Sequence, residues 1–330
     1  MGVRKTSFAS LLAAVLAGFA AAQDQRSLVA AFPPMVKCVA VVSPASPLDT
    51  ARLTHGVQLL EAAGVRVKVT PTARTVEQAS AEERARDFMS VWMDPEVDII
   101  LASRGGLGGE QVLPLLDWEM MRSNPKRFVG FSNMTCLLNA MLAHGVSHPI
   151  AGPNLGSLER VTTLDSIVRL GQTVVGAALD PVWLRPVNTE AKRGTGCRGK
   201  PMGGHVLALS RKTPDLHFPD PTGRIVFLEI GGGGCSANDV RIWLGDLEKR
   251  GVFAKCVGAV LCDFLECGTP EETQAMLQGF ADGVEAPVYA GYPFGHAPRS
   301  YAIDFEREAI ISPAGELTFA PPFRGRSKRR

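Results

Sequence analysis

Ser132, Glu229 and His296 are the residues of this 330-residue chain whose types and surroundings could support catalysis. Each lies at or just beyond the end of an apolar, strand-like run, close to glycine. A serine becomes a nucleophile when a neutral imidazole takes its proton and an acid orients that imidazole. The three residue types therefore suggest acyl-transfer chemistry, although their spacing in the sequence does not by itself bring them together.

Ser132 lies at an abrupt change from a strand-like run (128–131) to a helical run (133–144). A serine at such a turn has an exposed hydroxyl, and the N-terminus of the following helix stabilises negative charge that develops beside it. The segment differs from the pattern G-x-S-x-G, because Met134 stands in place of the last glycine. Serine is also a favoured N-cap residue, so a purely structural N-cap role is the alternative interpretation.

Glu229 ends the apolar run 225–228 and is followed closely by four glycines at 231–234, so its carboxylate could orient a base. The alternative is an exposed strand end. No Lys-Ser or Lys-Thr pair follows these glycines, and they do not predict a phosphate-binding loop. His296 lies in a turn framed by glycine and proline, where it could be that base; a surface or core position is the ordinary alternative for a histidine.

A second glycine-rich turn, Arg104 to Gly109 (RGGLGG), lies between a strand-like run and a helical run. Backbone N–H groups in such a turn can bind an anion or an oxyanion. The glycines do not follow the pattern G-x-G-x-x-G. The nearest following acid, Asp117, is also much closer than the roughly 20 residues expected for a ribose contact. We therefore expect an oxyanion-binding turn and no dinucleotide, with a purely structural turn as the alternative.

The elements that must position these residues alternate between strands and helices. We predict strands near 37–43, 65–69, 97–102 and 128–131, and helices near 49–63, 81–93, 109–118 and 133–144. This alternation predicts an α/β fold with a mostly parallel sheet and right-handed crossovers. It suggests an N-terminal α/β domain over residues 35–160.

The pattern changes after about residue 160. Residues 161–200 are predicted to be a linker or mobile loop, because much of the segment is rich in glycine, proline and basic residues. Further strands (224–229, 257–262) and helices (237–249, 270–281) then predict a C-terminal domain over residues 201–323, which carries Glu229 and His296.

The formal charge of +2 is unevenly distributed. Residues 1–22 carry two basic residues and no acid ahead of an apolar run, as a signal peptide does; an N-terminal helix is the alternative. Export to the periplasm or the medium is therefore expected, and a cytoplasmic location if the segment is not a signal. Residues 324–330 form a basic tail, either a solvated terminus or a contact for an anionic envelope polymer or lipid. The intervening body carries a charge of −5, so we expect no nucleic-acid partner.

The N-terminal apolar run is shorter than the about 20 residues of a spanning helix, and no later run is long enough, so no integral membrane span is expected. Seven cysteines without a CxxC pair make a zinc site improbable, and we predict no metal and no cofactor. After export, a disulfide among Cys197, Cys235 and Cys267 is possible, but the sequence does not assign a pair.

Taken in order, several segments resemble the LD-carboxypeptidase family of serine peptidases, which includes the microcin C immunity peptidases. The similar segments cover about residues 37–315 and are VSPASP (42–47), RGGLG (104–108), GFSNMT (130–135), PMGGH (201–205), FLE (227–229) with Arg241 downstream, and GH (295–296). Each segment is short, but their order is specific.

This resemblance implies a Ser–His–Glu triad in which Ser132 is the nucleophile, His296 the base and then the acid, and Glu229 the residue that orients the histidine. It implies an oxyanion hole formed by the backbone N–H groups of Gly106 and Asn133. It also implies substrate contacts from three further residues, Arg104, Gly105 and His205.

The resemblance further implies a Rossmann-like, parallel-sheet N-terminal domain, a smaller β-rich C-terminal domain and a homodimer. The implied activity is hydrolysis of the amide before a terminal D-amino acid in peptidoglycan-derived peptides, so the partner would be a small peptide substrate.

Four positions depart from the family pattern. Asn133 stands where aspartate is usual, Leu107 where tyrosine is common, His205 where asparagine is usual, and Ile230 where aspartate often follows the catalytic glutamate. Two alternative functions therefore remain. One is a non-catalytic protein of the same fold that binds cell-wall peptides or peptide-nucleotides, and the other is an exported amidase or esterase with another acyl substrate.

Overall fold

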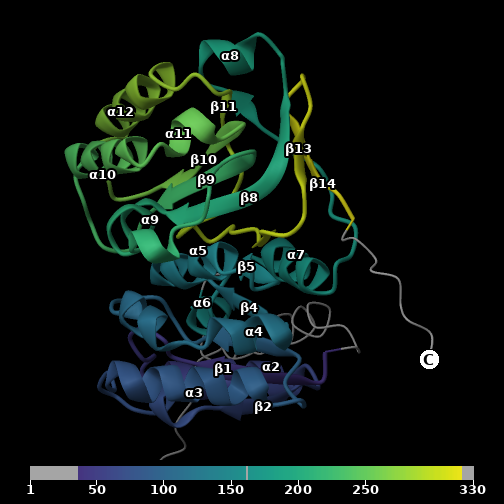
Figure 1. Ribbon diagram of the computed structural model, residues 1–330. Coiled ribbons are helices and arrows are strands. Elements are labelled where there is room, and N and C mark those ends of the chain that lie inside the picture. Colours follow the sequence, from purple (N-terminus) through teal and green to yellow (C-terminus); the bar gives the residue numbers. More distant parts are fainter. Residues whose placement is uncertain (1–35, 161–162, 322–330) are drawn as a thin grey trace, which may run out of the picture.

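The computed structural model describes residues 36–160 and 163–321, which build two sheet-containing layers stacked on each other (Figure 1). The predicted signal peptide (1–22) and basic tail (324–330) lie outside the described residues. No helix in the described part of the chain is long and apolar enough to cross a membrane.

The first layer contains a six-stranded sheet with the order β12-β5-β4-β3-β1-β2. Its strands are β1 (Cys38–Val42), β2 (Arg66–Val69), β3 (Ile99–Ala102), β4 (Arg127–Gly130), β5 (Pro149–Ala151) and β12 (Ile303–Asp304). Strands β1 to β5 pair in parallel, which confirms the predicted sheet, and only β12 is antiparallel. Strand β12 comes from the part of the chain predicted to be the C-terminal domain, so that segment returns to the first sheet.

The helices of the first layer are α2 (Thr50–Ala62), α3 (Ala81–Met93), α4 (Trp118–Ser123), α5 (Thr135–Ala143), α6 (Leu155–Arg160) and α7 (Leu164–Val174). Helix α3 has the predicted bounds and begins with a capping box between Ser80 and Glu83. The helix predicted over 109–118 is instead a 3₁₀ segment, η2 (Gly109–Leu115), followed by α4. It contains Pro114, which has no N–H to donate within a helix.

The second layer contains an eight-stranded sheet with the order β6-β14-β13-β8-β9-β10-β11-β7. Its strands are β6 (Val182–Trp183), β7 (Arg185–Pro186), β8 (Cys197–His205), β9 (Arg224–Ile230), β10 (Gly258–Phe264), β11 (Val288–Ala290), β13 (Ala309–Ile311) and β14 (Glu316–Phe319). Strands β8 to β11 are parallel neighbours, and the outer pairs are antiparallel. This layer is the predicted β-rich C-terminal part.

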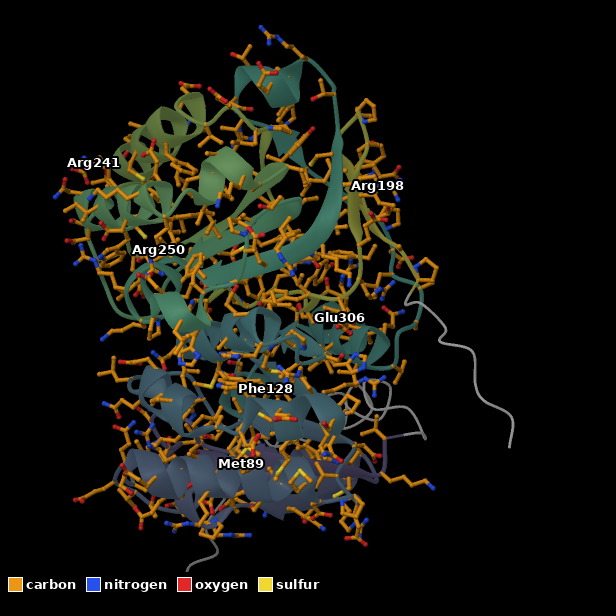
Figure 2. All side chains as sticks on the ribbon, in the orientation of Figure 1. Met89, Phe128, Arg198, Arg241, Arg250 and Glu306 are labelled. Atoms are coloured by element: carbon orange, nitrogen blue, oxygen red, sulfur yellow. The ribbon has the colours of Figure 1, made fainter. Side chains whose placement is uncertain are left out.

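Helices α8 (Thr189–Lys192), α9 (Val206–Arg211), α10 (Ala237–Lys249), α11 (Val252–Lys255) and α12 (Pro270–Asp282) complete the second layer. The segment predicted as a linker, 161–200, contains α7, β6, β7, α8 and the start of β8, so most of its described residues belong to the two layers. Its glycines and basic residues lie between and at the ends of short elements instead of forming one long loop. Side chains fill both layers, with Phe128 in the interior and Arg198 and Arg241 at the periphery (Figure 2).

Polar contacts from helix α5 hold the two layers together. The Thr135 hydroxyl accepts a hydrogen bond from the backbone N of His205 at 2.9 Å. The Asn139 amide accepts from the Gly203 N at 3.1 Å and donates to the Gly203 carbonyl at 2.8 Å. A Cβ at Gly204 would lie 2.4 Å from the Thr135 hydroxyl, so only glycine allows this approach. Because α5 begins just after Ser132, these bonds fix the nucleophile segment against the end of β8.

A histidine pair lies at the same junction. Nε2 of His144, at the C-terminus of α5, is 2.8 Å from Nδ1 of His217, which belongs to the 3₁₀ segment η4 (Asp215–His217) of the second layer. The Trp118 ring stacks on His144 with 4.3 Å between centroids. Burial lowers the pKa of both histidines, and each also lies near another positive or protonatable group. The junction is therefore built around two neutral imidazoles.

We expect acid to weaken this junction. In the unfolded chain these histidines bind protons near pH 6.5, whereas in the folded protein they bind them at lower pH. The unfolded state therefore holds more protons in this range, and the free energy of unfolding should fall as the pH drops below about 6.5. Urea denaturation at about pH 7.5 and pH 5.5 measures this difference. The variant His217→Gln should show a smaller change in the free energy of unfolding between the two pH values. The control His55→Gln, at an exposed position of α2, should show the same change as the wild type. An equal change in all three proteins would refute the assignment of this pH dependence to the histidine pair.

Candidate active site

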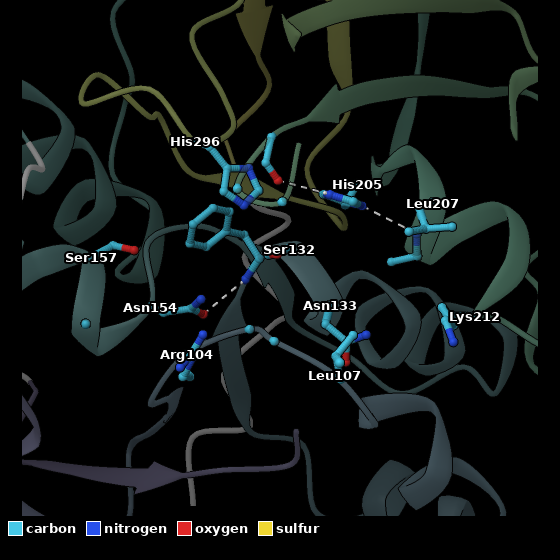
Figure 3. Close-up of a pocket in the computed structure, with 18 of the residues that line it drawn as sticks. Arg104, Leu107, Ser132, Asn133, Asn154, Ser157, His205, Leu207, Lys212 and His296 are labelled. Atoms are coloured by element: carbon cyan, nitrogen blue, oxygen red, sulfur yellow. Dashed lines mark hydrogen bonds between the residues drawn. The ribbon is translucent and has the colours of Figure 1, made fainter. Parts of the chain in front are cut away.

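A cavity of about 480 Å³ lies between the two layers and brings most of the predicted site residues together. Its lining includes Arg104, Gly105, Gly106, Leu107, Ser132 and Asn133 from the first layer and His205, Lys212, Gly231, Gly232 and His296 from the second. In the close-up, Ser132 lies between the imidazole of His296 and the side chain of Arg104 (Figure 3). Glu229 does not line the cavity but is hydrogen-bonded to His296.

The backbone at Ser132 is left-handed, with φ of 62°. This conformation is uncommon for a non-glycine residue and is typical of a strained strand-to-helix turn that exposes a nucleophile. The residue follows β4 and opens a 3₁₀ segment, η3 (Ser132–Met134), whose N-cap is Phe131; the N-cap of α5 is Met134. Ser132 is therefore not an N-cap, and that alternative interpretation is wrong.

Glu229 and His296 form a buried pair. Nδ1 of His296 lies 2.8 Å from Oε2 of Glu229, and the glutamate is completely buried. An ionised carboxylate only accepts hydrogen bonds, so Nδ1 of the histidine carries the donated proton. This arrangement leaves Nε2 as the basic nitrogen of the ring. A Cβ at Gly295, where φ is 139°, would lie 2.9 Å from the same carboxylate oxygen, so glycine before the histidine allows the close pairing.

The environment raises the pKa of His296. Burial alone would lower the pKa, but the hydrogen bond from the ring to Glu229 and the negative charge of that carboxylate more than offset this effect. The more distant charges of Glu266 and Asp263 act in the same direction. A buried imidazole that is stabilised when protonated can accept a proton during a reaction and return it later.

The histidine also lies over the nucleophile turn. The ring of Phe131, the residue before Ser132, packs against the ring of His296 with 4.9 Å between centroids. Ser132 and His296 line the same cavity, although they come from different layers. The structure thus places serine, histidine and glutamate in one site, with the glutamate on the far side of the ring.

The glycine-rich turn 104–109 packs directly on Ser132. A Cβ at Gly105 would lie 2.9 Å from Oγ of Ser132 and 3.2 Å from the backbone N of Asn133. The turn is held from both sides: Leu107 N donates to the Ser46 hydroxyl at 3.1 Å, and Gly109 N donates to Oδ1 of Asn133 at 2.8 Å. Asn133 therefore anchors the turn through its side chain.

We expect Gly105→Ala to lower kcat/KM by about 10²-fold. The added methyl group would occupy the space beside the serine hydroxyl and the Asn133 amide, where a reacting carbonyl must fit. Gly279→Ala in helix α12 is the matched control, because a Cβ there meets nothing within 4 Å. Steady-state kinetics on a peptide of the class that the sequence resemblance implies, with thermal unfolding of each variant, measure the effect. Full activity of Gly105→Ala would contradict this placement of the turn.

His205 is fixed next to the second glycine run. Its Nδ1 accepts a hydrogen bond from Ala208 N at 3.4 Å, so the proton is on Nε2, which lies 3.4 Å from the Gly231 carbonyl. Burial lowers the pKa of His205, which favours the neutral ring. His205 and Glu229 are opposite each other in the β8–β9 ladder, and the His205 and His296 rings lie 5.7 Å apart.

The remaining predicted positions have different surroundings. The Leu107 side chain is 69% exposed at the cavity, so an apolar group stands at its edge. Ile230 is buried in the apolar core of the second layer, away from the cavity lining. Arg241 donates to Asn238 on the surface of α10 and does not line the cavity.

Sequence reasoning missed Asp263 at the end of β10. Oδ2 of Asp263 is buried without a hydrogen-bond partner in the described structure, and burial raises its pKa to about 6. Asn154, which accepts from Phe131 N at 3.2 Å behind the nucleophile turn, was also missed. Neither residue lies in a recognisable motif; the β9–β10 pairing brings Asp263 to the site, and the β4–β5 pairing brings the segment with Asn154 there. Within the described ranges, no cluster of three or more His, Cys, Asp or Glu could hold a metal.

Comparison with known protein families gives two matches. Residues 39–151 match the LD-carboxypeptidase N-terminal domain, and residues 198–311 match the LD-carboxypeptidase C-terminal domain. Together they cover the first sheet, the central strands β8 to β11 of the second sheet and all three residues of the candidate triad.

Characterised relatives are similar over most of the chain. A murein tetrapeptide carboxypeptidase of Pseudomonas aeruginosa is 28% identical over 297 residues, which covers 83% of this chain and 92% of the relative. The microcin C7 self-immunity protein of Escherichia coli is 28% identical over 310 residues, which covers 81% of this chain and 90% of the relative. The similarity therefore extends to proteins with two different names and roles.

Solved structures share the fold. The muramoyltetrapeptide carboxypeptidase of Oxalobacter formigenes superposes with a TM-score of 0.76 at 24% identity, over 87% of this chain and all of that one. A microcin-immunity-like protein of Streptococcus pneumoniae, solved with AMP, superposes with a TM-score of 0.74 at 19% identity, over 87% of this chain and 99% of that one. At these identities the likeness concerns the arrangement of the two layers.

Proposed function

Because this chain belongs to the LD-carboxypeptidase family, we propose that it is a serine hydrolase that cleaves the amide before a terminal D-amino acid in peptidoglycan-derived peptides. The observation that carries the proposal is the buried Glu229–His296 pair beside a serine in a strained, left-handed turn. An exposed serine, a polarised imidazole and a buried carboxylate are the parts that acyl transfer needs.

In the proposed reaction, Nε2 of His296 takes the proton of the Ser132 hydroxyl as its oxygen attacks the amide carbonyl. Glu229 holds the ring in the required tautomer and stabilises the imidazolium that forms. The imidazolium then gives the proton to the amine of the departing D-residue. Water, activated by the same nitrogen, hydrolyses the acyl-enzyme and returns the serine.

The oxyanion of the tetrahedral intermediate would be held by the backbone N–H groups of Gly106 and Asn133. Both residues line the cavity next to Ser132, and φ of 94° at Gly106 is a conformation that glycine adopts readily. Ser46 stands within 2.5 Å of a Cβ at this glycine, so a side chain would also be excluded sterically. Removing one donor of this kind typically costs roughly 10²–10³ in turnover.

The charge of the cavity supports a substrate with a free carboxylate. Its described lining includes the cations Arg52, Arg104 and Lys212, and none of the described lining residues is acidic. Lys212 is paired with Glu110 at 3.4 Å and Arg52 with Asp49 at 3.8 Å, so we propose that the planar guanidinium of Arg104 makes the bidentate carboxylate contact. A peptide that ends in a D-amino acid carries such a group next to the bond to be cut.

Product analysis distinguishes this proposal from a non-catalytic binding protein. Purified protein is incubated with a murein tetrapeptide, and mass spectrometry follows loss of the terminal D-alanine. A serine-reactive phosphonate should label the peptide that contains Ser132. Absence of both cleavage and labelling would favour the binding protein, and labelling with cleavage of other amides only would favour an amidase.

The terminal carboxylate should matter to the reaction. We expect a tetrapeptide with its C-terminus amidated to show a kcat/KM at least about tenfold lower, because the amide cannot form a charge-assisted bidentate contact with an arginine. Arg104→Ala should narrow this preference by lowering activity on the free acid more than on the amide. Equal loss on both substrates would show that Arg104 does not read the carboxylate.

The homodimer and the export of the chain are further proposals. Light scattering after gel filtration would show the mass of the assembly, and N-terminal sequencing of protein from cell fractions would show whether residues 1–22 are removed.

A further inference from the structure

Two cysteines of the second layer, Cys235 and Cys267, lie beside the candidate active site. Cys235 directly follows the glycine run 231–234, and Cys267 lies just after β10. The backbone N of Cys235 donates to the carbonyl of Glu266 at 2.9 Å, which holds the two segments side by side. Burial and the nearby Cys235 thiol raise the pKa of Cys267, whose own Sγ donates to the Leu265 carbonyl at 3.0 Å.

This arrangement suits a disulfide. A hydrogen bond from the backbone N of Cys235 to the carbonyl of the residue preceding Cys267 makes the two cysteines neighbours on adjacent segments, and a disulfide joins α-carbons roughly 4.4–6.8 Å apart. Cys197 is placed elsewhere: it lies on β8, and its sulfur would be 2.6 Å from a Cβ at Gly258. Of the three cysteines the sequence left as candidates, the structure brings two together.

The two segments that carry these thiols also pack beside the His296 side chain. A Cβ at Gly231 would lie 2.8 Å from Cβ of His296, and one at Gly232 would lie 2.8 Å from its Nε2. Leu265 and Glu266, on the other segment, line a second cavity of about 250 Å³ together with Gly232 and His296. A covalent link between these two segments would therefore also restrain the surroundings of His296, the proposed base.

We propose that Cys235 and Cys267 are a redox modification site whose disulfide ties the glycine run 231–234 to the segment after β10, beside His296. Because a backbone hydrogen bond already holds the two segments side by side, we expect closing the bond to require little movement of either segment. The oxidised protein therefore keeps the geometry of the site and loses conformational freedom mainly in its unfolded state. Without the disulfide, four successive glycines give this segment more backbone freedom than other residues would.

The oxidant is a low-molecular-weight disulfide such as oxidised glutathione. The thiolate of Cys235, the more exposed of the two residues, attacks the oxidant and releases one glutathione thiolate, forming a mixed disulfide. The thiolate of Cys267 then attacks the Cys235 sulfur and releases the second. The protein loses two protons and two electrons, and the oxidant becomes two thiols. Burial raises the pKa of both thiols, that of Cys267 to about 12, so the exchange should accelerate with increasing pH.

The test uses the full chain in a glutathione buffer at about pH 8.5, followed by alkylation and peptide mapping. We expect one linked peptide pair, Cys235 with Cys267, a rise in Tm of about 5 °C that dithiothreitol reverses, and kcat on any cleaved peptide within about twofold. Cys235→Ser should abolish both the linkage and the rise, and Cys197→Ser should retain both.

Two results would overturn the proposal. One is the absence of the Cys235–Cys267 link after oxidation of folded protein. The other is an equal rise in Tm in Cys235→Ser. Because linkage and Tm are read without substrate, failure here is distinguishable from failure of the proposed hydrolase activity.

Discussion

Ser132→Ala should reduce kcat for release of the terminal D-residue from a murein tetrapeptide by at least about 10⁴-fold. The variant lacks the oxygen that attacks the amide carbonyl in the proposed mechanism, so no acyl-enzyme can form. Any hydrolysis that remains faster than the uncatalysed reaction in water would come from the oxyanion hole and from substrate binding. The Kd for the tetrapeptide, measured calorimetrically, should change little, because the cations of the cavity are untouched.

The fold should tolerate this change. Alanine adopts φ of 62° no more easily than serine does, so the strain of the turn stays the same and Tm should shift by only a degree or two. Ser90→Ala on the exposed face of α3 is the matched control and should keep full activity. Activity of Ser132→Ala equal to that of the wild type would remove Ser132 from the reaction and, with it, the proposed triad.

Glu229→Gln should lower kcat by about 10²–10⁴-fold with the backbone intact. The glutamine can offer its N–H group to Nδ1 of His296 and so favour the tautomer that places the proton on Nε2, the wrong nitrogen for a base. The imidazolium would also lose the negative charge that stabilises it. Steady-state kinetics over a range of pH measure both effects.

The pH profile provides a separate readout. Glu229 is the main group that raises the pKa of His296, so its neutral replacement should lower that pKa. Since the histidine must be neutral to act as a base, the acid limb of the kcat/KM profile should move to lower pH in Glu229→Gln. Glu266→Gln is the matched control: this exposed residue contributes a smaller charge effect and should shift the limb only slightly. An unchanged limb in Glu229→Gln would contradict the assignment of His296 as the base.

The departures from the family pattern now have physical surroundings. Asn133 still supplies an acceptor to Gly109 N, which an amide oxygen provides without burying a charge. Ile230 contributes to the core of the second layer. Asn133, Leu107 and His205 all line the cavity, but the Asn133 side chain is bonded to Gly109 N, so we expect the exposed Leu107 and the neutral His205 to influence substrate choice more than the chemical step.

Local pattern was sufficient for most elements. Strands β1 to β4 and helices α2, α3, α10 and α12 lie within a few residues of their predicted positions, because apolar periodicity and caps such as Ser80 mark them directly. The prediction from local pattern failed over 109–118, where a proline favours a 3₁₀ segment. It also failed over 161–200, where short elements depend on pairing with distant strands. Two-residue strands such as β6 and β12 have no periodicity to read.

The sequence by itself determined the family and the residue types of the site, because ordered motifs such as GFSNMT and GH are local. Tertiary structure alone decided three things: that Ser132 adopts a left-handed turn and is not an N-cap, that Nδ1 of His296 meets Oε2 of Glu229 at 2.8 Å, and that the backbone of Cys235 pairs with Glu266, next to Cys267. Each depends on contacts between segments far apart in the chain. Hydrophobic patterns and turn signals are local and carry no information about such contacts. The contacts follow from how the two sheets pack and from the glycines that let the backbones approach each other.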